Sequence, residues 1–292
     1  MSNILGTGVA LITPFNNNSS IDFKSLANLI EHVINGGVDF LVILGTTAET
    51  TSLSVEEKKE VINFIIEKNK KRLPLVLGIG GNNTNKVIKE ILSTDLSSFD
   101  AILSVTPYYN KPSQEGLYFH YKEISQASPI PIILYNVPSR TGVNMSANIT
   151  LKLANDFLNI IAIKEASGDL KQINQILDEK PASFNVLSGD DALTLEMINS
   201  GASGVISVIG QSHPQEFSDM VSAGLDNDKL KANKIHNDLF GLYHFLYSEG
   251  NPSGIKALLS LMNLCENNLR LPLVPISNSL HNELKQYLDG LH

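Results

Sequence analysis

One lysine of this chain follows a run of four apolar residues, which is an unusual position for a charged side chain. Lys164 comes directly after Ile160–Ile163, and lysine is rarely buried without a partner. An amine withdrawn from water loses its charge more easily, and the neutral amine can attack a carbonyl group. The alternatives are a lysine that reaches solvent or one that pairs with a carboxylate such as Glu165. The run alone does not decide between a nucleophile and a structural lysine.

Polar residues also follow three other apolar runs. The first group is Gly45-Thr46-Thr47, where glycine permits close backbone approach and hydroxyl groups suit a small carboxylate. A simple strand-to-helix turn is the alternative. The other two groups contain Tyr109 and the pair Tyr135 and Arg140, which could supply proton transfer and a carboxylate clamp. Aromatic packing and a surface arginine would explain the same residues.

Eight short apolar runs alternate with amphipathic stretches, and this pattern predicts the elements that must position these residues. Runs without polar alternation are typical of parallel strands covered on both faces. The runs are Gly8–Thr13, Asp39–Gly45, Leu75–Gly80, Ala101–Thr106, Ile130–Asn136, Ile160–Ala166, Asn185–Gly189 and Gly204–Ile209. Eight strand-helix units predict an α/β fold, a (β/α)8 TIM barrel, whose active site lies at the carboxyl ends of the strands.

The helical stretches have recognisable start signals. Ser54 followed by Glu57 forms a capping-box pattern, and Asp22 and Ser146 are predicted N-caps. An open doubly wound sheet is the alternative fold, but the glycine-rich phosphate turn expected after its first strand is absent. We therefore predict a catalytic barrel over residues 1–224. A three-helix extension over residues 225–292 is predicted to consist of Asp228–Tyr247, Ser253–Asn267 and Ser279–Leu288.

Composition excludes several classes of partner. The chain of 292 residues has a formal net charge of -8 and no run rich in lysine or arginine, so we expect no nucleic-acid partner. No apolar run is long enough to span a bilayer. The single cysteine, Cys265, permits no intrachain disulfide, and we predict a buried thiol in a cytoplasmic protein. The seven histidines are scattered without metal-ligand spacing, so we expect no metal.

In combination, order and spacing, these segments closely resemble the 4-hydroxy-tetrahydrodipicolinate synthases over nearly the whole chain. That family belongs to the pyruvate-dependent class I aldolases, which include N-acetylneuraminate lyase. The segments that carry the resemblance are Gly45-Thr46-Thr47, Val105–Asn110, Tyr135–Gly142, Ile163–Ala166, Leu187–Asp191 and Gly204–Val208. The resemblance implies a lyase of lysine and diaminopimelate biosynthesis. Its substrates would be pyruvate and L-aspartate-4-semialdehyde, and it would need no cofactor beyond a covalent pyruvate imine on Lys164.

The resemblance also implies a role for each residue of the site. Lys164 would form the imine, and Thr46 and Thr47 would hold the pyruvate carboxylate. Tyr135, Thr46 and Tyr109 would form a proton relay, with Tyr109 supplied by a neighbouring subunit of a dimer or of a tetramer built of dimers. The carboxylate of the second substrate would bind Arg140. The site would be lined by the backbone of Gly189 and Ile206.

Some segments depart from the family pattern. Alanine stands at position 48, where glycine is more usual, and the segments Asn251–Gly254 and Gly210–Pro214 differ from the common loops without holding an expected catalytic residue. Lysine-sensitive relatives carry a glutamate and histidines at the positions of Lys86, Val55 and Lys58. Since two cations would meet a cationic ligand, the resemblance implies weak or absent inhibition by lysine.

A sister aldolase that cleaves a sialic acid or another sugar acid is the nearest rival interpretation. Relatives of that kind generally lack an arginine at the position of Arg140, which argues against it. A catalytically silent barrel that senses a small acid is the rival from another class of protein. The presence of Lys164, Tyr135, Thr46 and Tyr109 argues against that interpretation.

Overall fold

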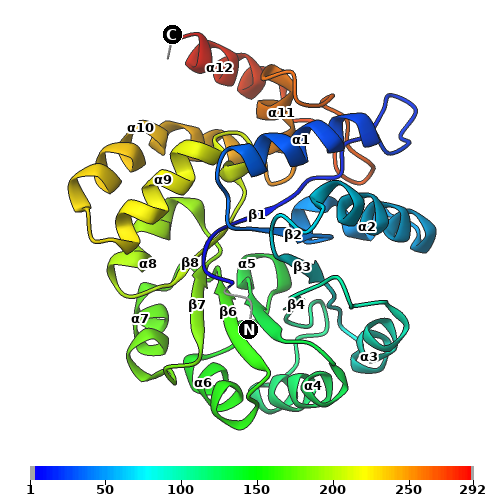
Figure 1. The fold of residues 1–292 in the computed structure, drawn as a ribbon, viewed down its shortest axis with the longest axis vertical. Helices are drawn as coiled ribbons and strands as arrows, with labels where there is room; N and C mark the ends of the chain where they lie inside the picture. The colour runs from blue at the N-terminus through cyan, green and yellow to red at the C-terminus, as the bar shows by residue number, and fades with distance from the viewer. Residues whose placement is uncertain (1–3, 291–292) are drawn as a thin grey trace.

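Eight parallel strands form a closed barrel in the computed structural model, which describes residues 4–290. Each strand pairs with its neighbours in sequence, and β8 closes the sheet against β1. Figure 1 shows the strands inside a ring of helices, as the alternating pattern predicts. The strands are β1 Gly6–Ala10, β2 Phe40–Ile43, β3 Leu75–Gly78, β4 Ala101–Val105, β5 Ile132–Asn136, β6 Ile160–Glu165, β7 Asn185–Ser188 and β8 Gly204–Ser207.

Most helices lie on the outside of the barrel, and short helical turns follow several strands at their carboxyl ends (Figure 1). The α-helices around the barrel are α1 Phe23–Asn35, α2 Val55–Asn69, α3 Thr84–Ser93, α4 Gln114–Ala127, α5 Pro138–Thr141, α6 Ala147–Asp156, α7 Leu170–Glu179, α8 Thr194–Asn199 and α9 Pro214–Leu225. The 3-10 turns are η1 Thr46–Ala48, η2 Thr50–Ser52, η3 Asp191–Leu193 and η4 Ile209–Gln211.

The predicted helix starts are confirmed. The Ser54 hydroxyl accepts from the Glu57 amide while the Glu57 carboxylate accepts from the Ser54 amide, which completes the capping box of α2. Asp22 and Ser146 cap α1 and α6 in the same way through their side chains. Each cap satisfies a backbone amide that the helix leaves unpaired and contributes about 1 kcal/mol.

The apolar residues form two layers of core. All residues of β1, β2, β5 and β8 are buried, because the strands face the barrel interior on one side and the helices on the other. A large ring fills the space interior to the strands at one level: a Cβ atom added at Gly8 would lie only 2.1 Å from the Phe40 ring. Buried aliphatic side chains such as Leu26 and Ile124 fill the space between strands and helices. Each contributes about 1.5–3 kcal/mol relative to an exposed position.

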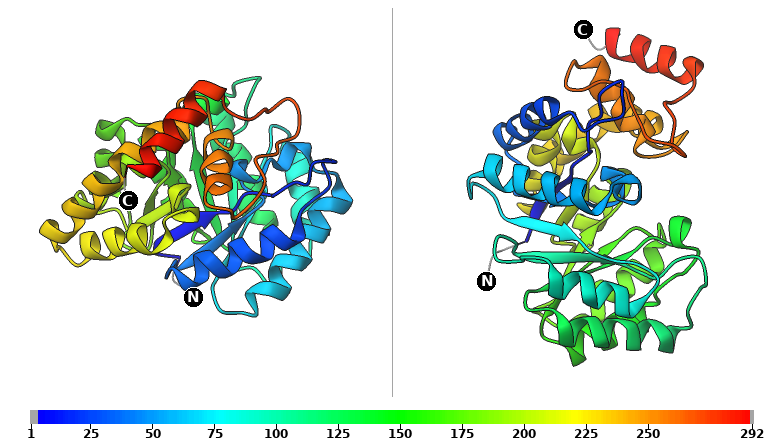
Figure 2. Two further views of the ribbon diagram at one scale, coloured as in Figure 1. Left: turned by 90° about the horizontal axis from the view of Figure 1, so that it is seen from above. Right: turned by 90° about the vertical axis from the view of Figure 1, so that its right-hand side faces the viewer.

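Three helices follow the last helix of the barrel: α10 Lys229–Tyr247, α11 Ser253–Leu261 and α12 Asn278–Asp289. α10 packs on α9 and α11, and α12 projects furthest from the strands (Figure 2). The predicted helix from Ser253 is shorter than expected, because its last turn gives way after Leu261 to a loop in which Asn263 has φ of 59°. The division of the chain at residue 224 remains a prediction.

Within residues 4–290, no helix has both the length and the apolar composition needed to cross a lipid bilayer.

Candidate active site

Strand register places Lys164 beside Tyr135. The two residues are paired across β5 and β6, so both stand at the same level near the carboxyl end of the barrel. The Lys164 Nζ atom lies 4.6 Å from the centre of the Tyr135 ring, and only 6% of Lys164 is exposed. A cation over an aromatic ring is stabilised without being neutralised by a counter-ion. The structure therefore holds the amine at a strand end and away from bulk water.

Glu165 does not pair with Lys164. Successive residues of a strand point to opposite faces, and the buried Glu165 carboxylate accepts hydrogen bonds from the Asn136 amide at 3.1 Å and from the Ser167 backbone amide at 2.7 Å. Burial raises the pKa of Glu165, although these hydrogen bonds oppose the shift. Among residues 4–290 no carboxylate forms an ion pair with Lys164. The interpretation of Lys164 as a paired structural lysine is therefore wrong.

Lys164 opens into a cavity of about 150 Å³, which we call the inner cavity. Its wall comes from the carboxyl ends of the strands, the loops that follow them and the start of the C-terminal extension. The lining residues are Ala10, Gly45, Thr46, Thr47, Leu103, Tyr135, Val137, Ser139, Arg140, Lys164, Ala166, Gly189, Asp190, Val208, Tyr247 and Asn251. The cavity thus brings together six of the eight predicted site residues.

Gly189 leaves the space that the lysine side chain occupies. A Cβ atom at this position would lie 2.7 Å from the Ala166 Cβ atom and 3.0 Å from the Lys164 Cε atom. A side chain here would push Lys164 away from its place. By contrast, Ile206 does not line the inner cavity: its side chain packs inside the barrel in the cluster that contains Tyr135 and Leu187, and Val208 lines the cavity instead.

The two threonines stand on the 3-10 turn η1, directly after β2. Thr47 is almost fully buried, and its Oγ1 atom accepts a hydrogen bond of 2.9 Å from the Asn251 Nδ2 atom. The turn is also held by Thr13, whose hydroxyl donates to the Ala48 carbonyl at 2.8 Å. A turn anchored on both sides offers its hydroxyl groups in a fixed arrangement.

Arg140 lies on the short helix α5 and is exposed at the mouth of the cavity. Its Nη2 atom donates to the Asn251 carbonyl oxygen at 3.1 Å. The other two arginines of the described chain, Arg72 and Arg270, form ion pairs with glutamates, whereas no carboxylate of residues 4–290 pairs with Arg140. Its guanidinium group can therefore receive the carboxylate of a ligand in two parallel hydrogen bonds.

Tyr109 does not reach the site of its own chain. Its side chain is 87% exposed and lines neither the inner cavity nor its neighbour. Its backbone has φ of 77°, a left-handed conformation that is rare for a bulky residue. Such conformations persist where the surrounding structure enforces them and are frequent at functional sites. The loop thus directs an aromatic side chain away from the molecule.

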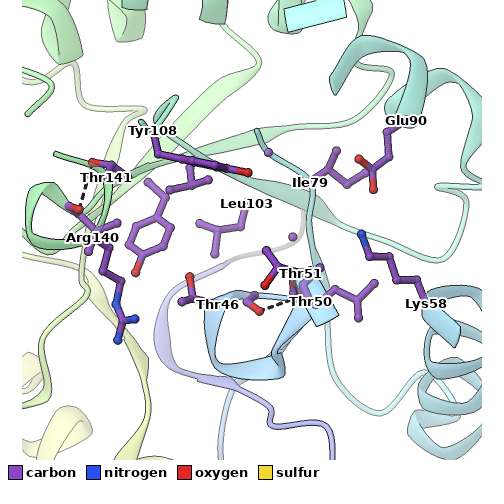
Figure 3. Close-up of a pocket in the computed structure, with 17 residues that line it drawn as sticks. Thr46, Thr50, Thr51, Lys58, Ile79, Glu90, Leu103, Tyr108, Arg140 and Thr141 are labelled. Atoms are coloured by element: carbon purple, nitrogen blue, oxygen red, sulfur yellow. Dashed lines mark hydrogen bonds between the residues drawn. The ribbon is translucent and has the colours of Figure 1, made fainter. Parts of the chain in front are cut away.

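A second cavity of about 320 Å³ adjoins the inner one and shares Gly45, Thr46, Tyr135 and Arg140 with it. We call it the outer cavity. Figure 3 shows Thr46, Tyr108 and Arg140 on one part of its wall and the charged ends of Lys58 and Glu90 on another.

The outer cavity changes the electrostatic argument about lysine inhibition. We expected that a cationic ligand would meet Lys58 and Lys86 without a compensating carboxylate. Glu90 lines the cavity and Lys86 does not. The two residues stand one turn apart on the same side of α3, and the cavity wall is formed at the turn that carries Glu90. Glu90 thus stands opposite Lys58, and weak or absent inhibition by lysine remains a prediction.

Sequence reasoning missed two residues at or near the inner cavity. Asn251 connects Thr47 to Arg140 but stands in a loop that gave no catalytic signal. Asp191 is fully buried, accepts from the Val208 and Ile209 amides and from the Tyr247 hydroxyl, and has its pKa raised by burial. Only the apolar surroundings of the Gly189-Asp190-Asp191 stretch could have indicated a buried carboxylate.

Cys265 and His120 do not line the inner cavity. The Cys265 thiol is buried, and burial raises its pKa to about 12, so it is a poor nucleophile near neutral pH. His120 is buried, and its Nδ1 atom lies 2.9 Å from the Thr84 hydroxyl. No cluster of three or more histidine, cysteine, aspartate or glutamate side chains suited to a metal ion occurs between residues 4 and 290.

Comparison with known proteins agrees with this geometry. Residues 3–291 match the model of the dihydrodipicolinate synthetase family. The 4-hydroxy-tetrahydrodipicolinate synthase of Flavobacterium psychrophilum is 52% identical over 291 residues, which cover 100% of this chain and 99% of the relative. The crystal structure of the Aquifex aeolicus dihydrodipicolinate synthase is 40% identical, with a TM-score of 0.95 over 99% of this chain and 98% of that one.

A third relative was solved with a ligand. The chloride-inhibited dihydrodipicolinate synthase of Acinetobacter baumannii, complexed with pyruvate, is 38% identical to this chain, with a TM-score of 0.94 over 98% of each chain. The match of sequence and fold over the full length identifies this chain as a member of the dihydrodipicolinate synthetase family.

Proposed function

We propose that this protein condenses pyruvate with L-aspartate-4-semialdehyde to form 4-hydroxy-tetrahydrodipicolinate, in the cytoplasmic pathway to diaminopimelate and lysine. Relatives named for this reaction match the chain over its full length. The observation that carries the proposal is Lys164, a buried amine that no carboxylate of the described residues pairs with. Its cavity also holds hydroxyl groups and the guanidinium of Arg140. This combination suits an electrophilic keto acid and a second, anionic substrate.

Imine formation accounts for the placement of the lysine. The Lys164 amine attacks the ketone carbon of pyruvate, and loss of water leaves a cationic imine. The cation acidifies the methyl protons, and loss of one proton gives a nucleophilic enamine. The enamine then attacks the aldehyde carbon of the second substrate. The amino group of the product finally displaces Lys164, which closes the ring and frees the enzyme without any cofactor.

The hydroxyl groups near Lys164 suit the proton transfers. Every step moves a proton, and a chain of Tyr135, Thr46 and Tyr109 could carry it between the imine and solvent. Thr46 and Thr47 would hold the pyruvate carboxylate on the turn η1. Gly189 and Val208, which line the inner cavity, would complete the wall around the imine.

The position of Tyr109 supports an assembly of at least two subunits. Its side chain points away from its own cavity, so it can act only in the site of another chain. We infer a dimer, or a tetramer built of dimers, in which each site contains Tyr109 of the neighbouring subunit. The free guanidinium of Arg140 favours a carboxylate-bearing aldehyde as second substrate over the sugar acids of sister aldolases.

Trapping with borohydride tests the covalent step. Pyruvate and borohydride should add mass to the peptide that contains Lys164, and Lys164→Ala should lose at least about three orders of magnitude in turnover, because the covalent route splits the difficult step. Lys171→Ala, which removes an exposed lysine on α7, is the matched control and should behave like the unchanged protein. Trapping of pyruvate elsewhere by Lys164→Ala would contradict the assignment.

Arg140 should affect the second substrate alone. Arg140→Ala and Arg140→Lys should lower kcat/KM for L-aspartate-4-semialdehyde by about 10- to 100-fold, since a charged hydrogen bond contributes about 1.5–3 kcal/mol and lysine cannot reproduce the fork. Borohydride trapping of pyruvate should remain close to normal. Arg72→Lys is the control, because Arg72 pairs with Glu31 away from the cavities. Equal damage to both half-reactions would refute a selective role.

Complementation between two inactive variants tests whether Tyr109 acts in the site of a neighbouring subunit. Tyr109→Phe and Lys164→Ala proteins should each be inactive, and subunit exchange between them should restore activity, because a mixed dimer has one site with both groups. Tyr135→Phe mixed with Lys164→Ala is the control and should recover nothing, since Tyr135 and Lys164 stand on adjacent strands of one chain. Demonstrated exchange with no recovery in the first mixture would place Tyr109 outside the reaction.

A further inference from the structure

Two oppositely charged side chains meet beneath the turn that carries Thr46 and Thr47. Lys256 on α11 and Glu49 form an ion pair, and their side chains are 0% and 1% exposed. Each of the other ion pairs in the described chain is at least partly open to solvent. Removing two charges from water is costly, and an apolar pair of similar size is often at least as stable. A gain in stability therefore does not explain this pair.

Glu49 controls the shape of the turn. Its backbone has φ of 53° and ψ of 36°, a left-handed conformation, where it joins η1 to η2. Its amide donates to the Thr46 carbonyl at 3.2 Å, and its own carbonyl accepts from the Ser52 amide at 2.8 Å. A residue other than glycine keeps this conformation only when neighbouring contacts enforce it. The Glu49 side chain supplies such contacts.

The contacts come from the C-terminal extension. The Lys256 Nζ atom also donates to the Asn268 carbonyl at 2.8 Å and lies 4.2 Å from the centre of the Phe15 ring. The second carboxylate oxygen of Glu49 accepts from the Arg270 amide at 3.0 Å. Figure 2 shows α11 and the chain after it beside the loop that follows β1, where Asn268 donates to the Phe15 carbonyl. Three residues of the extension therefore hold the turn: Lys256 and Arg270 contact Glu49, and Asn251 contacts Thr47.

We propose that Glu49 and Lys256 are positioning residues for pyruvate, which fix the Thr46–Thr47 turn to the C-terminal extension at the distance from Lys164 that imine formation needs. The proposal rests on the function proposed above. Neither side chain lines a cavity, so both act through the turn. Small displacements of such groups weaken a reaction strongly, because reacting atoms must lie within about 3–3.5 Å of each other.

A double variant separates positioning from stability. Lys256→Met and Glu49→Leu alone should each lower the melting temperature, because each leaves one charge buried and unpaired. Together they should restore the melting temperature, because no buried charge remains. The Michaelis constant for pyruvate should nevertheless stay about tenfold raised in the double variant, while that for L-aspartate-4-semialdehyde should not change. Lys234→Met with Asp238→Leu is the control, since that pair is exposed.

Two further measurements keep the test decisive. Hydrogen exchange of the amides in residues 46–52 should be faster in the double variant than in the unchanged protein, whatever reaction the enzyme catalyses. If no variant or parent forms the pyruvate imine, the proposed function fails, and this exchange rate alone decides the positioning. Should the double variant not fold, Glu49→Gln serves instead, and its Michaelis constant for pyruvate should rise several-fold at unchanged kcat.

Normal exchange in residues 46–52 would overturn the proposal. So would a double variant, or a folded Glu49→Gln variant, with an unchanged Michaelis constant for pyruvate.

Discussion

A buried lysine amine that no carboxylate of residues 4–290 pairs with is the constraint on which this structure depends. Lys164 lies over the Tyr135 ring, and the neighbouring carboxylate of Glu165 points to the other face of the strand, where Asn136 and Ser167 hold it. If Glu165 faced the interior, its carboxylate could form a salt bridge with the amine. The alternation of side chains along β6 thus places the Lys164 amine and the Glu165 carboxylate on opposite faces of the strand.

The loops around Lys164 complete the site, and their positions depend on distant parts of the chain. Asn251 contacts both Thr47 and Arg140, and Lys256 holds Glu49 below the same turn. The C-terminal helices therefore do more than cover the barrel. They fix the positions of the two threonines and the arginine relative to the strands of the barrel.

Much of this arrangement could be predicted from the sequence. The eight apolar runs indicated the barrel, and the polar residues at their ends included five that line the inner cavity, which are Thr46, Thr47, Tyr135, Arg140 and Lys164. Contacts between distant segments were not predictable, because no local pattern marks Asn251 or joins Lys256 to Glu49. The sequence also does not show which turn of α3 borders the outer cavity. Lys86 and Glu90 both stand on this helix, and only the fold reveals that Glu90 lines the cavity. The exposure of Tyr109 likewise depends on a left-handed backbone that its residue type disfavours.

Product formation from pyruvate and L-aspartate-4-semialdehyde is the most direct test of the central claim. Purified protein would be assayed with both substrates through a coupled reaction, and with N-acetylneuraminate in parallel. The account predicts condensation that requires both pyruvate and the aldehyde, with no cleavage of the sugar acid. Cleavage of N-acetylneuraminate without condensation would contradict it, because the amine of Lys164 would then serve a different second substrate from the one that Arg140 is proposed to select.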